Sequence, residues 1–506
     1  MAHHVGRAIL LAWLLSFPAL AHAGACSELN RLAGQALPQT SIDLAASVAA
    51  GQFAPDGDMA RALTVPAFCR VTGVIAPSVR FEVWLPDNWN GKFSMTGGGG
   101  SVGYINYADM RTAIAAGYAT ASTDTGHLAG DNEWIRKPEL LDAYFHTAVH
   151  AVAVRAKTLI AARYDRPPLK SYYNSCSNGG RQGLMEALRY PEDFDGIVAG
   201  APAHFLSRSF TLNFWLANSA IPDGETVVLT PEVLAILNNA VVAACDRRDG
   251  VADGVIENPK RCEFDPGRLR CKAGRSSPCL TEAQVTAARA IYAGPRNPRT
   301  GAAIYPGPSP GSEMDWSSVW RRYFAGPNAS AGLSFMRILF HGPDWRWSQF
   351  NFDTDQALLT QRFADADAVD PNLDAFRRRG GKIILYHGWN DASVAPAYTL
   401  QYRDAVAAHI ARDPTARKGA MDDFMRVFMV PGMTHCSGGM GTDRFDMAPA
   451  LDRWVSDGVA PTRVIAARIV DARTVRTRPL CVWPQVARWD RKGDTDAAES
   501  FVCAKP

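Results

Sequence analysis

Two dipeptides that lie far apart in the chain constrain this sequence most. Cys176-Ser177 and His435-Cys436 each place a cysteine directly beside a residue type used in catalysis. A disulfide holds its two Cα atoms about 5.5 Å apart. A bridge between Cys176 and Cys436 would therefore bring Ser177 and His435 within reach of each other. A hydroxyl beside an imidazole is the arrangement in which a histidine activates a serine nucleophile.

The residues around Ser177 are typical of a nucleophile elbow, a sharp turn between a strand and a helix. The pattern predicts a strand over residues 169–173 and a helix over residues 184–190, on either side of the serine. The motif usually written G-x-S-x-G has glycine two residues before and two residues after the serine; here the second is Gly179, but the first is Ser175. The same residues could also form a glycine-rich turn that only connects two elements.

Two later segments supply an acid and a base. Residues 382–386 form a continuous apolar run, typical of a buried parallel strand, and Asp391 follows that run. Residues 424–430 repeat the pattern and are followed by His435. One aspartate or histidine in such a place is more often structural. Together, in the order Ser177, Asp391, His435 found in α/β-hydrolases, they predict a catalytic triad.

Such a triad also needs donors for the oxyanion of the tetrahedral intermediate. One donor is expected to be the backbone N–H of Asn178, the residue after the nucleophile. A second is expected from the glycine-rich run 96–100, which follows a short apolar segment. That run could also be a flexible turn or a phosphate loop, but it lacks the Gly-Lys-Ser/Thr ending of the latter.

Strand and helix patterns alternate before residue 203 and resume after residue 370, which predicts an α/β class protein, and specifically an α/β-hydrolase fold with a large inserted lid domain. The catalytic domain is expected to comprise residues 24–203 and 371–506. Residues 204–370 differ in composition, with frequent Trp, Pro, Gly and Asp. Because this segment is inserted between the nucleophile strand and the acid strand, we expect it to cover the active-site face.

The N-terminus indicates export. Residues 1–23 carry early basic residues, an apolar stretch too short to span a membrane, and the ending Ala21-His22-Ala23, which together predict a removed signal peptide. All ten cysteines follow it, and an even number in an exported chain favours five disulfides over a metal site. The expected location is secreted or periplasmic. A formal charge of +3 indicates no nucleic-acid partner, no membrane contact is expected after signal removal, and oligomeric state is left open.

Several stretches resemble the tannase/feruloyl esterase family of α/β-hydrolases, which includes hydrolases of mono(2-hydroxyethyl) terephthalate. The resemblance extends over nearly all of the chain after the signal peptide and is carried by residues 176–181, 190–202, 385–391, 430–445 and 478–481. It implies that Gly100 is the second oxyanion donor. It also implies the disulfide pairs Cys26–Cys69, Cys176–Cys436, Cys245–Cys262, Cys271–Cys279 and Cys481–Cys503.

Residues 245–256 space their carboxylates three and four apart, with Asp-Gly turns between them. Calcium takes roughly six to eight oxygen ligands, and a turning loop can supply them. From the residues alone, however, a pair of Asp-Gly turns with exposed acids is the simpler interpretation. The resemblance implies a structural Ca²⁺ in the lid, and no organic cofactor. Its ligands would be the carboxylates of Asp246, Asp249 and Asp253 and the carbonyls of Val251 and Val255.

The substrate is expected to be a small aromatic ester. The lid is rich in aromatic residues that could bind an aromatic acyl group or form the core of the lid itself; these are Trp316, Trp320, Tyr323, Phe335, Phe340, Trp345, Trp347 and Phe350. In the terephthalate type, a lid arginine holds the free carboxylate of the substrate. Here no arginine stands at the matching position near Ala329, and Arg337 is the closest candidate.

These expectations describe a secreted serine esterase that acts on esters of phenolic acids, such as feruloyl or galloyl esters. Hydrolysis of mono(2-hydroxyethyl) terephthalate is the alternative. An alternative of another class is an inactive hydrolase-fold binding protein, which would have no need for the three triad residues together.

Overall fold

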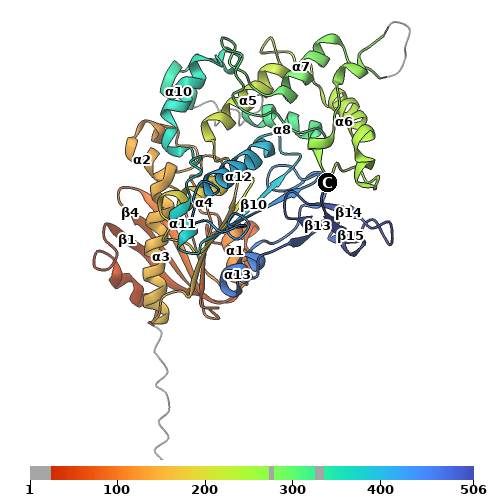
Figure 1. Ribbon diagram of the computed structural model, residues 1–506. Coiled ribbons are helices and arrows are strands. Elements are labelled where there is room, and N and C mark those ends of the chain that lie inside the picture. Colours follow the sequence, from red (N-terminus) through yellow and green to blue (C-terminus); the bar gives the residue numbers. More distant parts are fainter. Residues whose placement is uncertain (1–23, 273–277, 325–334) are drawn as a thin grey trace, which may run out of the picture.

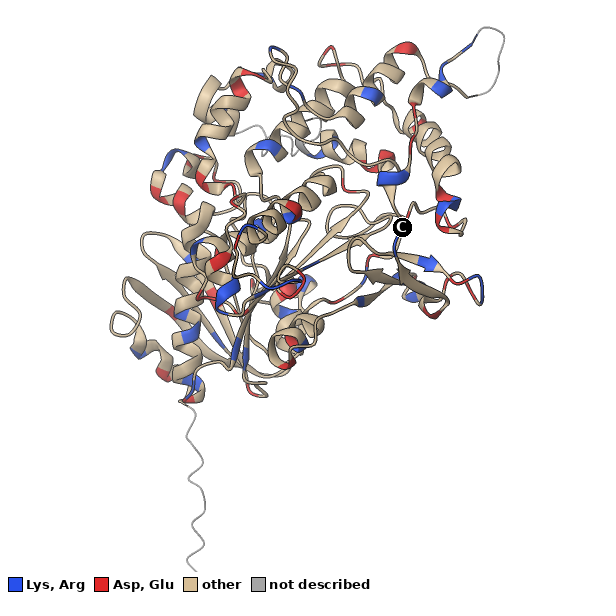
Figure 2. Ribbon diagram, in the orientation of Figure 1, with Lys and Arg blue, Asp and Glu red and all other residues tan. Residues whose placement is uncertain are grey.

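The computed structural model describes residues 24–272, 278–324 and 335–506, so the predicted signal peptide lies outside the described residues. Within those ranges, no helix combines the length and the apolar character that a membrane span requires. Figure 2 shows charged residues of both signs mainly on the helices and loops around a central sheet.

In the described part of the chain, nine strands form one sheet in the order β1-β4-β5-β7-β6-β8-β9-β10-β11 (Figure 1). Six neighbouring strands are parallel, in the spatial order β7-β6-β8-β9-β10-β11. The strands β1, β4 and β5 add an antiparallel extension at one edge. The predicted α/β architecture is confirmed. The strands are β1 (Thr40–Val48), β4 (Phe68–Ile75), β5 (Val79–Pro86), β6 (Lys92–Met95), β7 (Ala119–Thr123), β8 (Lys170–Cys176), β9 (Gly196–Gly200), β10 (Lys382–Gly388) and β11 (Met425–Val430).

Helices cover both faces of the sheet, so most residues of central strands such as β7, β10 and β11 are buried. Every residue of β9 is buried. One face carries α3, α4 and α12, and the other carries α1 and α13. The helices are α1 (Tyr107–Ala115), α2 (Pro138–Asp142), α3 (Ala148–Tyr164), α4 (Asn178–Arg189), α11 (Asp374–Arg378), α12 (Pro396–Ile410) and α13 (Ala448–Asp457).

The N-terminal part differs from the simple strand–helix alternation that the sequence pattern predicts. Four of its strands, the short pair β2 (Gly51–Phe53) and β3 (Leu63–Val65) among them, precede β5 before any α-helix appears. The edge strand β1 is partly exposed along its length, so its sequence lacks the continuous apolar run of a central strand. The helical segment from Pro138 to Tyr164 is not one continuous α-helix, because a π-helical turn, Ala143–Thr147, separates α2 from α3.

Two small antiparallel pairs lie near the C-terminus, β12 (Arg463–Val470) with β13 (Arg473–Cys481) and β14 (Val486–Trp489) with β15 (Phe501–Ala504).

Between β9 and α11 the chain forms a helical layer that lies above one end of the sheet (Figure 1). This layer, called the lid below, has a buried core that includes Phe214, Trp316 and Trp320. It contacts the loop after β10, because the Asn390 amide donates a hydrogen bond to the Gly311 carbonyl at 2.6 Å. Its α-helices are α5 (Leu206–Ala220), α6 (Pro231–Cys245), α7 (Glu282–Ala293), α8 (Glu313–Tyr323) and α10 (Thr354–Arg362).

Five disulfides connect the ten cysteines in the pairs that the family resemblance implies. The bridge with the longest span joins Cys176, the last residue of β8, to Cys436, in the loop after β11, with Cα atoms 6.0 Å apart. Four shorter bridges constrain local segments, and Cys271–Cys279 spans only 8 residues.

Removal of the long bridge by the double substitution Cys176→Ala/Cys436→Ala should lower the free energy of unfolding more than removal of the shortest. By the chain-entropy model, a closed loop of 260 residues contributes about 5 to 6 kcal/mol and one of 8 residues about 2 to 3 kcal/mol. Urea unfolding followed by tryptophan fluorescence measures both. Equal losses in Cys176→Ala/Cys436→Ala and Cys271→Ala/Cys279→Ala would contradict the prediction.

Candidate active site

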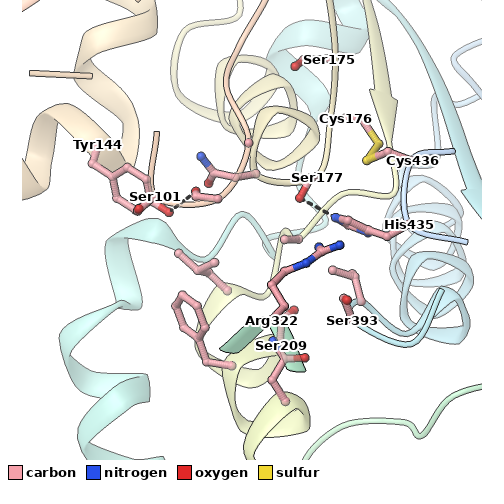
Figure 3. Close-up of a pocket in the computed structure, with 18 of the residues that line it drawn as sticks. Ser101, Tyr144, Ser175, Cys176, Ser177, Ser209, Arg322, Ser393, His435 and Cys436 are labelled. Carbon is pink, nitrogen blue, oxygen red and sulfur yellow. Dashed lines mark hydrogen bonds between the residues drawn. A yellow bond between two sulfur atoms is a disulfide. The ribbon is translucent and has the colours of Figure 1, made fainter. Parts of the chain in front are cut away.

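The structure brings the three predicted triad residues together at the ends of three parallel strands. The Nε2 of His435 lies 2.7 Å from the Oγ of Ser177, and its Nδ1 lies 2.6 Å from the Oδ2 of Asp391. Figure 3 shows the serine and the imidazole facing each other, with the Cys176–Cys436 bridge beside them. This geometry allows His435 to accept the hydroxyl proton while Asp391 orients the ring.

Ser177 has the backbone conformation of a nucleophile elbow. Its φ of 66° and ψ of −127° place it in a strained turn between β8 and α4. A Cβ atom on Gly179 would collide with the Ser175 hydroxyl, and one on Gly180 would collide with the Gly200 carbonyl. The serine that replaces the first glycine of the usual motif is therefore accommodated because Gly179 leaves space for it.

Asp391 is fully buried, and all its oxygens are engaged. One accepts hydrogen bonds from the backbone N–H groups of Ser393 and Val394, and the other lies within 3.1 Å of both His435 and His387. Burial alone would raise the pKa of Asp391, but the His435 charge and the two histidine hydrogen bonds outweigh it and lower the pKa. The acid therefore stays ionised beside the imidazole.

His387 is a positioning residue that the sequence reasoning missed. It is fully buried, and its Nδ1 lies 2.8 Å from the Thr399 hydroxyl. Its Nε2 contacts the Asp391 carboxylate and the Val394 carbonyl, so the buried ring holds the acid loop in place. The signal that could have revealed it is its place as the penultimate residue of β10, four residues before Asp391.

Charges of opposite sign act on the pKa of His435. Burial would lower the pKa of His435, but the charge and hydrogen bond of Asp391 outweigh it and raise the pKa above its usual value. The nearby cation Arg322, in α8, acts in the opposite direction. Figure 3 shows the Arg322 side chain directed into the cavity toward Ser177 and His435.

The predicted oxyanion donors lie at the same cavity as the nucleophile. Asn178 is the first residue of α4, so its backbone N–H has no acceptor within the helix. Gly100, with a φ of 56°, lies in the loop after β6 and lines the cavity together with Gly99 and Ser101. Backbone from two segments, the start of α4 and the loop after β6, therefore borders the cavity near Ser177.

The cavity has a volume of about 590 Å³ and is lined by aromatic side chains from both the lid and the catalytic domain. Of the eight lid aromatics named from sequence, the side chains of seven are described, and among those seven only Phe335 lines the cavity. Most of the others form the lid core. The cavity instead uses aromatic residues that the sequence reasoning did not single out, which are Trp134, Tyr144, Phe210 and Phe363.

The arginine at the cavity is also not the one that the sequence suggested. Ala329 lies outside the described residues. The Nε of Arg337 donates a hydrogen bond to the Trp345 carbonyl at 2.8 Å, and this arginine does not line the cavity. Arg322 does line it, although its sequence position carried no signal.

The predicted calcium ligands lie in one loop after α6. The Asp246 carboxylate accepts from the backbone N–H groups of Asp253 and Gly254, and Asp249 lines a small cavity beside it. Burial, and then the charges of Asp253 and Asp246, raise the pKa of Asp249 to about 6. An all-oxygen set of three carboxylates and two carbonyls suits Ca²⁺ in its chemistry.

The Asp253 carboxylate of this loop is also paired with cations from the C-terminal strands. Its Oδ2 lies 2.5 Å from Arg478 and 3.3 Å from Arg476. These two arginines, both in β13, join the loop to the catalytic domain. A bound Ca²⁺ would share Asp253 with them, while Val251 and Val255 supply their carbonyls.

Comparison with known proteins identifies the family of this chain. A family model described as tannase and feruloyl esterase matches residues 61–504. An uncharacterised esterase of Xanthomonas campestris is 36% identical, covering 98% of this chain and 95% of the relative. A mono(2-hydroxyethyl) terephthalate hydrolase of Piscinibacter sakaiensis is 33% identical, covering 88% and 86%. The crystal structure of feruloyl esterase B from Aspergillus oryzae has a TM-score of 0.82 at 28% identity, covering 92% and 97%. The chain therefore belongs to the tannase and feruloyl esterase family and is a carboxylic ester hydrolase.

Proposed function

We propose that this protein is an exported serine esterase that hydrolyses esters of aromatic acids through an acyl-enzyme. The observation that carries the proposal is the hydrogen-bonded series Ser177–His435–Asp391 at an aromatic-lined cavity of about 590 Å³. A cavity of this size and lining suits a single phenolic acyl group. Several relatives carry the name probable feruloyl esterase, which agrees with such a substrate.

The reaction proceeds in two halves. As the Ser177 hydroxyl attacks the ester carbonyl, His435 takes its proton and Asp391 stabilises the resulting imidazolium. The oxyanion is bound by the backbone N–H groups of Asn178 and Gly100, each worth on the order of 3 kcal/mol of barrier. His435 then gives its proton to the leaving alcohol. Water repeats the sequence on the acyl-enzyme and releases the acid.

Export is part of the proposal because five disulfides persist only in an oxidising compartment. Removal of residues 1–23 would leave a mature chain that begins at Gly24, and N-terminal sequencing of the exported protein checks this start.

Replacement Ser177→Ala should abolish hydrolysis of methyl ferulate and methyl gallate and leave the melting temperature unchanged, because only the attacking oxygen is lost. Rates are measured by release of the free acid. The matched control is Ser209→Ala, a serine of the same cavity whose hydroxyl donates to the Phe205 carbonyl, and it should retain activity. Residual activity of Ser177→Ala near the wild-type rate would contradict the mechanism and favour another nucleophile.

A second candidate substrate is an aromatic ester with a free carboxylate, such as mono(2-hydroxyethyl) terephthalate. It is supported by Arg322, whose cationic side chain points into the cavity, and by the relative that bears that activity in its name. An arginine can bind a carboxylate through two parallel hydrogen bonds.

Replacement Arg322→Gln separates the two candidates. If the carboxylate-bearing ester is a substrate, its kcat/KM should fall about tenfold to a hundredfold, because a charged hydrogen bond is lost, while kcat/KM for methyl ferulate changes little.

The Arg322→Gln variant also removes a charge that lowers the pKa of His435. Since neutral His435 is the base, activity is lost as pH falls through its pKa, and the acid limb of kcat/KM should move to higher pH. An unmoved limb with equal losses on both esters would refute this role.

We propose also that the loop from Asp246 to Val255 binds a structural Ca²⁺ through Asp246, Asp249, Asp253 and the carbonyls of Val251 and Val255. The support is the all-oxygen donor set and the small cavity lined by Asp246 and Asp249. The ion would join the lid to β13 and take no part in proton transfer.

Chelation should therefore lower the melting temperature, and 1 mM CaCl2 should restore it, by a stabilisation of about 2.7 kcal/mol when the ion is at 100 times its dissociation constant. Scanning calorimetry measures the effect. Asp249→Asn should abolish the calcium response, whereas Asp344→Asn, an exposed lid carboxylate outside the loop, should keep it. No calcium response in the wild-type protein would reject the site.

A further inference from the structure

A second cluster of ligand-type side chains lies outside both the catalytic site and the predicted calcium loop. His150 of α3, Glu186 of α4 and Asp193, in the turn before β9, each offer a ligand atom, and these atoms all lie within 4.8 Å of one another. Among the described residues this is the one group of three or more His, Cys, Asp or Glu side chains that converges so closely.

Glu186 is the unusual member of the cluster. It is 1% exposed, no N–H or hydroxyl group of the described residues donates to its carboxylate oxygens, and its hydrogen-bonding neighbour is another carboxyl group, that of Asp193. An ionised carboxylate without such a donor is strongly unfavourable in a protein interior. Burial, followed by the charge of Asp193, raises the pKa of Glu186 well above its usual value. Either a proton or a cation must therefore neutralise this side chain.

His150 supplies a nitrogen donor and a route to solvent. Its Nδ1 lies 2.6 Å from the Oδ2 of Asp193, and its side chain is 37% exposed. The imidazole stacks on the ring of Tyr190 with centroids 4.0 Å apart, which fixes the orientation of the ring. An ion could reach the buried carboxylates past the exposed edge of this histidine.

We propose that His150, Glu186 and Asp193 bind a divalent transition-metal ion of the zinc class. One imidazole and two carboxylates are ligands that Zn²⁺ accepts at about 2.0 to 2.2 Å. The three ligand atoms lie within 4.8 Å of one another, so small side-chain movements would bring all three to an ion between them. Calcium and magnesium favour all-oxygen sites, so the histidine selects against them. Three protein ligands leave one position for water at the exposed side.

The charges around the cluster permit such an ion. Lys157 donates to the Asp193 carbonyl and lies 3.9 Å from its Oδ1, so one ammonium group already faces the two carboxylates. With both carboxylates ionised, one negative charge remains uncompensated. A divalent cation would displace the proton that Glu186 otherwise keeps.

The site would connect α3 to α4, the helix that begins directly after Ser177. Glu186 lies eight residues after Asn178, about 12 Å along α4 from the nucleophile elbow. Ligands from α3, α4 and the following turn would hold α4 against α3 without touching the substrate. The ion is therefore expected to stabilise the fold rather than to take part in hydrolysis.

The test uses the full mature protein, stripped with a chelator and then kept in excess CaCl2, so that the proposed calcium loop is satisfied throughout. Titration with CoCl2 is followed by the visible absorption of protein-bound Co²⁺, and ZnCl2 is then added in competition. We expect one Co²⁺ per chain at this cluster, displaced by Zn²⁺, together with a rise in melting temperature. A wild-type protein that binds neither ion more tightly than about 100 μM would overturn the proposal.

Three variants identify the ligands. Glu186→Gln copies the shape of the protonated side chain, and His150→Gln removes the nitrogen donor; each should weaken binding by about tenfold or more. His146→Gln is the matched control, because His146 lies one turn earlier and its Nδ1 contacts the Tyr190 hydroxyl instead. Since His435 remains in all three, an ion bound at the triad would be unaffected by them. Equal affinity in Glu186→Gln and wild type would show that Glu186 simply keeps its proton, and would refute the metal site.

Discussion

The parallel pairing of β8, β9, β10 and β11 is the constraint on which the active site depends. In this register Cys176 pairs with Gly200, Gly200 with Tyr386, and Gly388 with Val430. The strands therefore end at one edge, and the residues just beyond them reach the same place. The Cys176–Cys436 disulfide then joins the nucleophile turn to the histidine loop directly, so that a serine and a histidine 258 residues apart share a hydrogen bond.

The strand ends of the sheet position the triad residues, and the lid supplies part of the cavity wall. It packs against the acid loop, where the backbone N–H of Ala392 donates to Asp315 of α8. Most of its large tryptophan side chains, such as Trp316, Trp320 and Trp345, are buried in its own core and do not line the cavity. Phe210, Phe335 and Phe363 of the lid line the cavity that also contains Ser177 and His435, and Arg322 adds one cation to it. Phe335 and Phe363 belong both to the buried core of the lid and to the wall of the cavity, so the packing of the lid also shapes the cavity.

The sequence allowed the chemistry to be predicted better than the specificity. Strand-end residues in the order Ser177, Asp391, His435 need only local signals, because each follows a segment with a strand pattern, which is continuously apolar before Asp391 and His435. The antiparallel strand β1 was missed because an exposed edge strand has no such run. Counting cysteines gave five disulfides, but the pairs came from family resemblance, since counting does not determine connectivity. His387 was missed because a buried histidine is recognised only by what surrounds it.

The sequence alone predicted the type of reaction, the order of the catalytic groups and the family of the chain. It could do so because strand periodicity and short motifs are local properties of the polypeptide. Only the tertiary structure decided which aromatic residues line the cavity, that Arg322 points toward His435, and that His150, Glu186 and Asp193 meet. Such contacts depend on the packing of helices that are distant in sequence, and no local pattern of residues records the direction in which a buried side chain points.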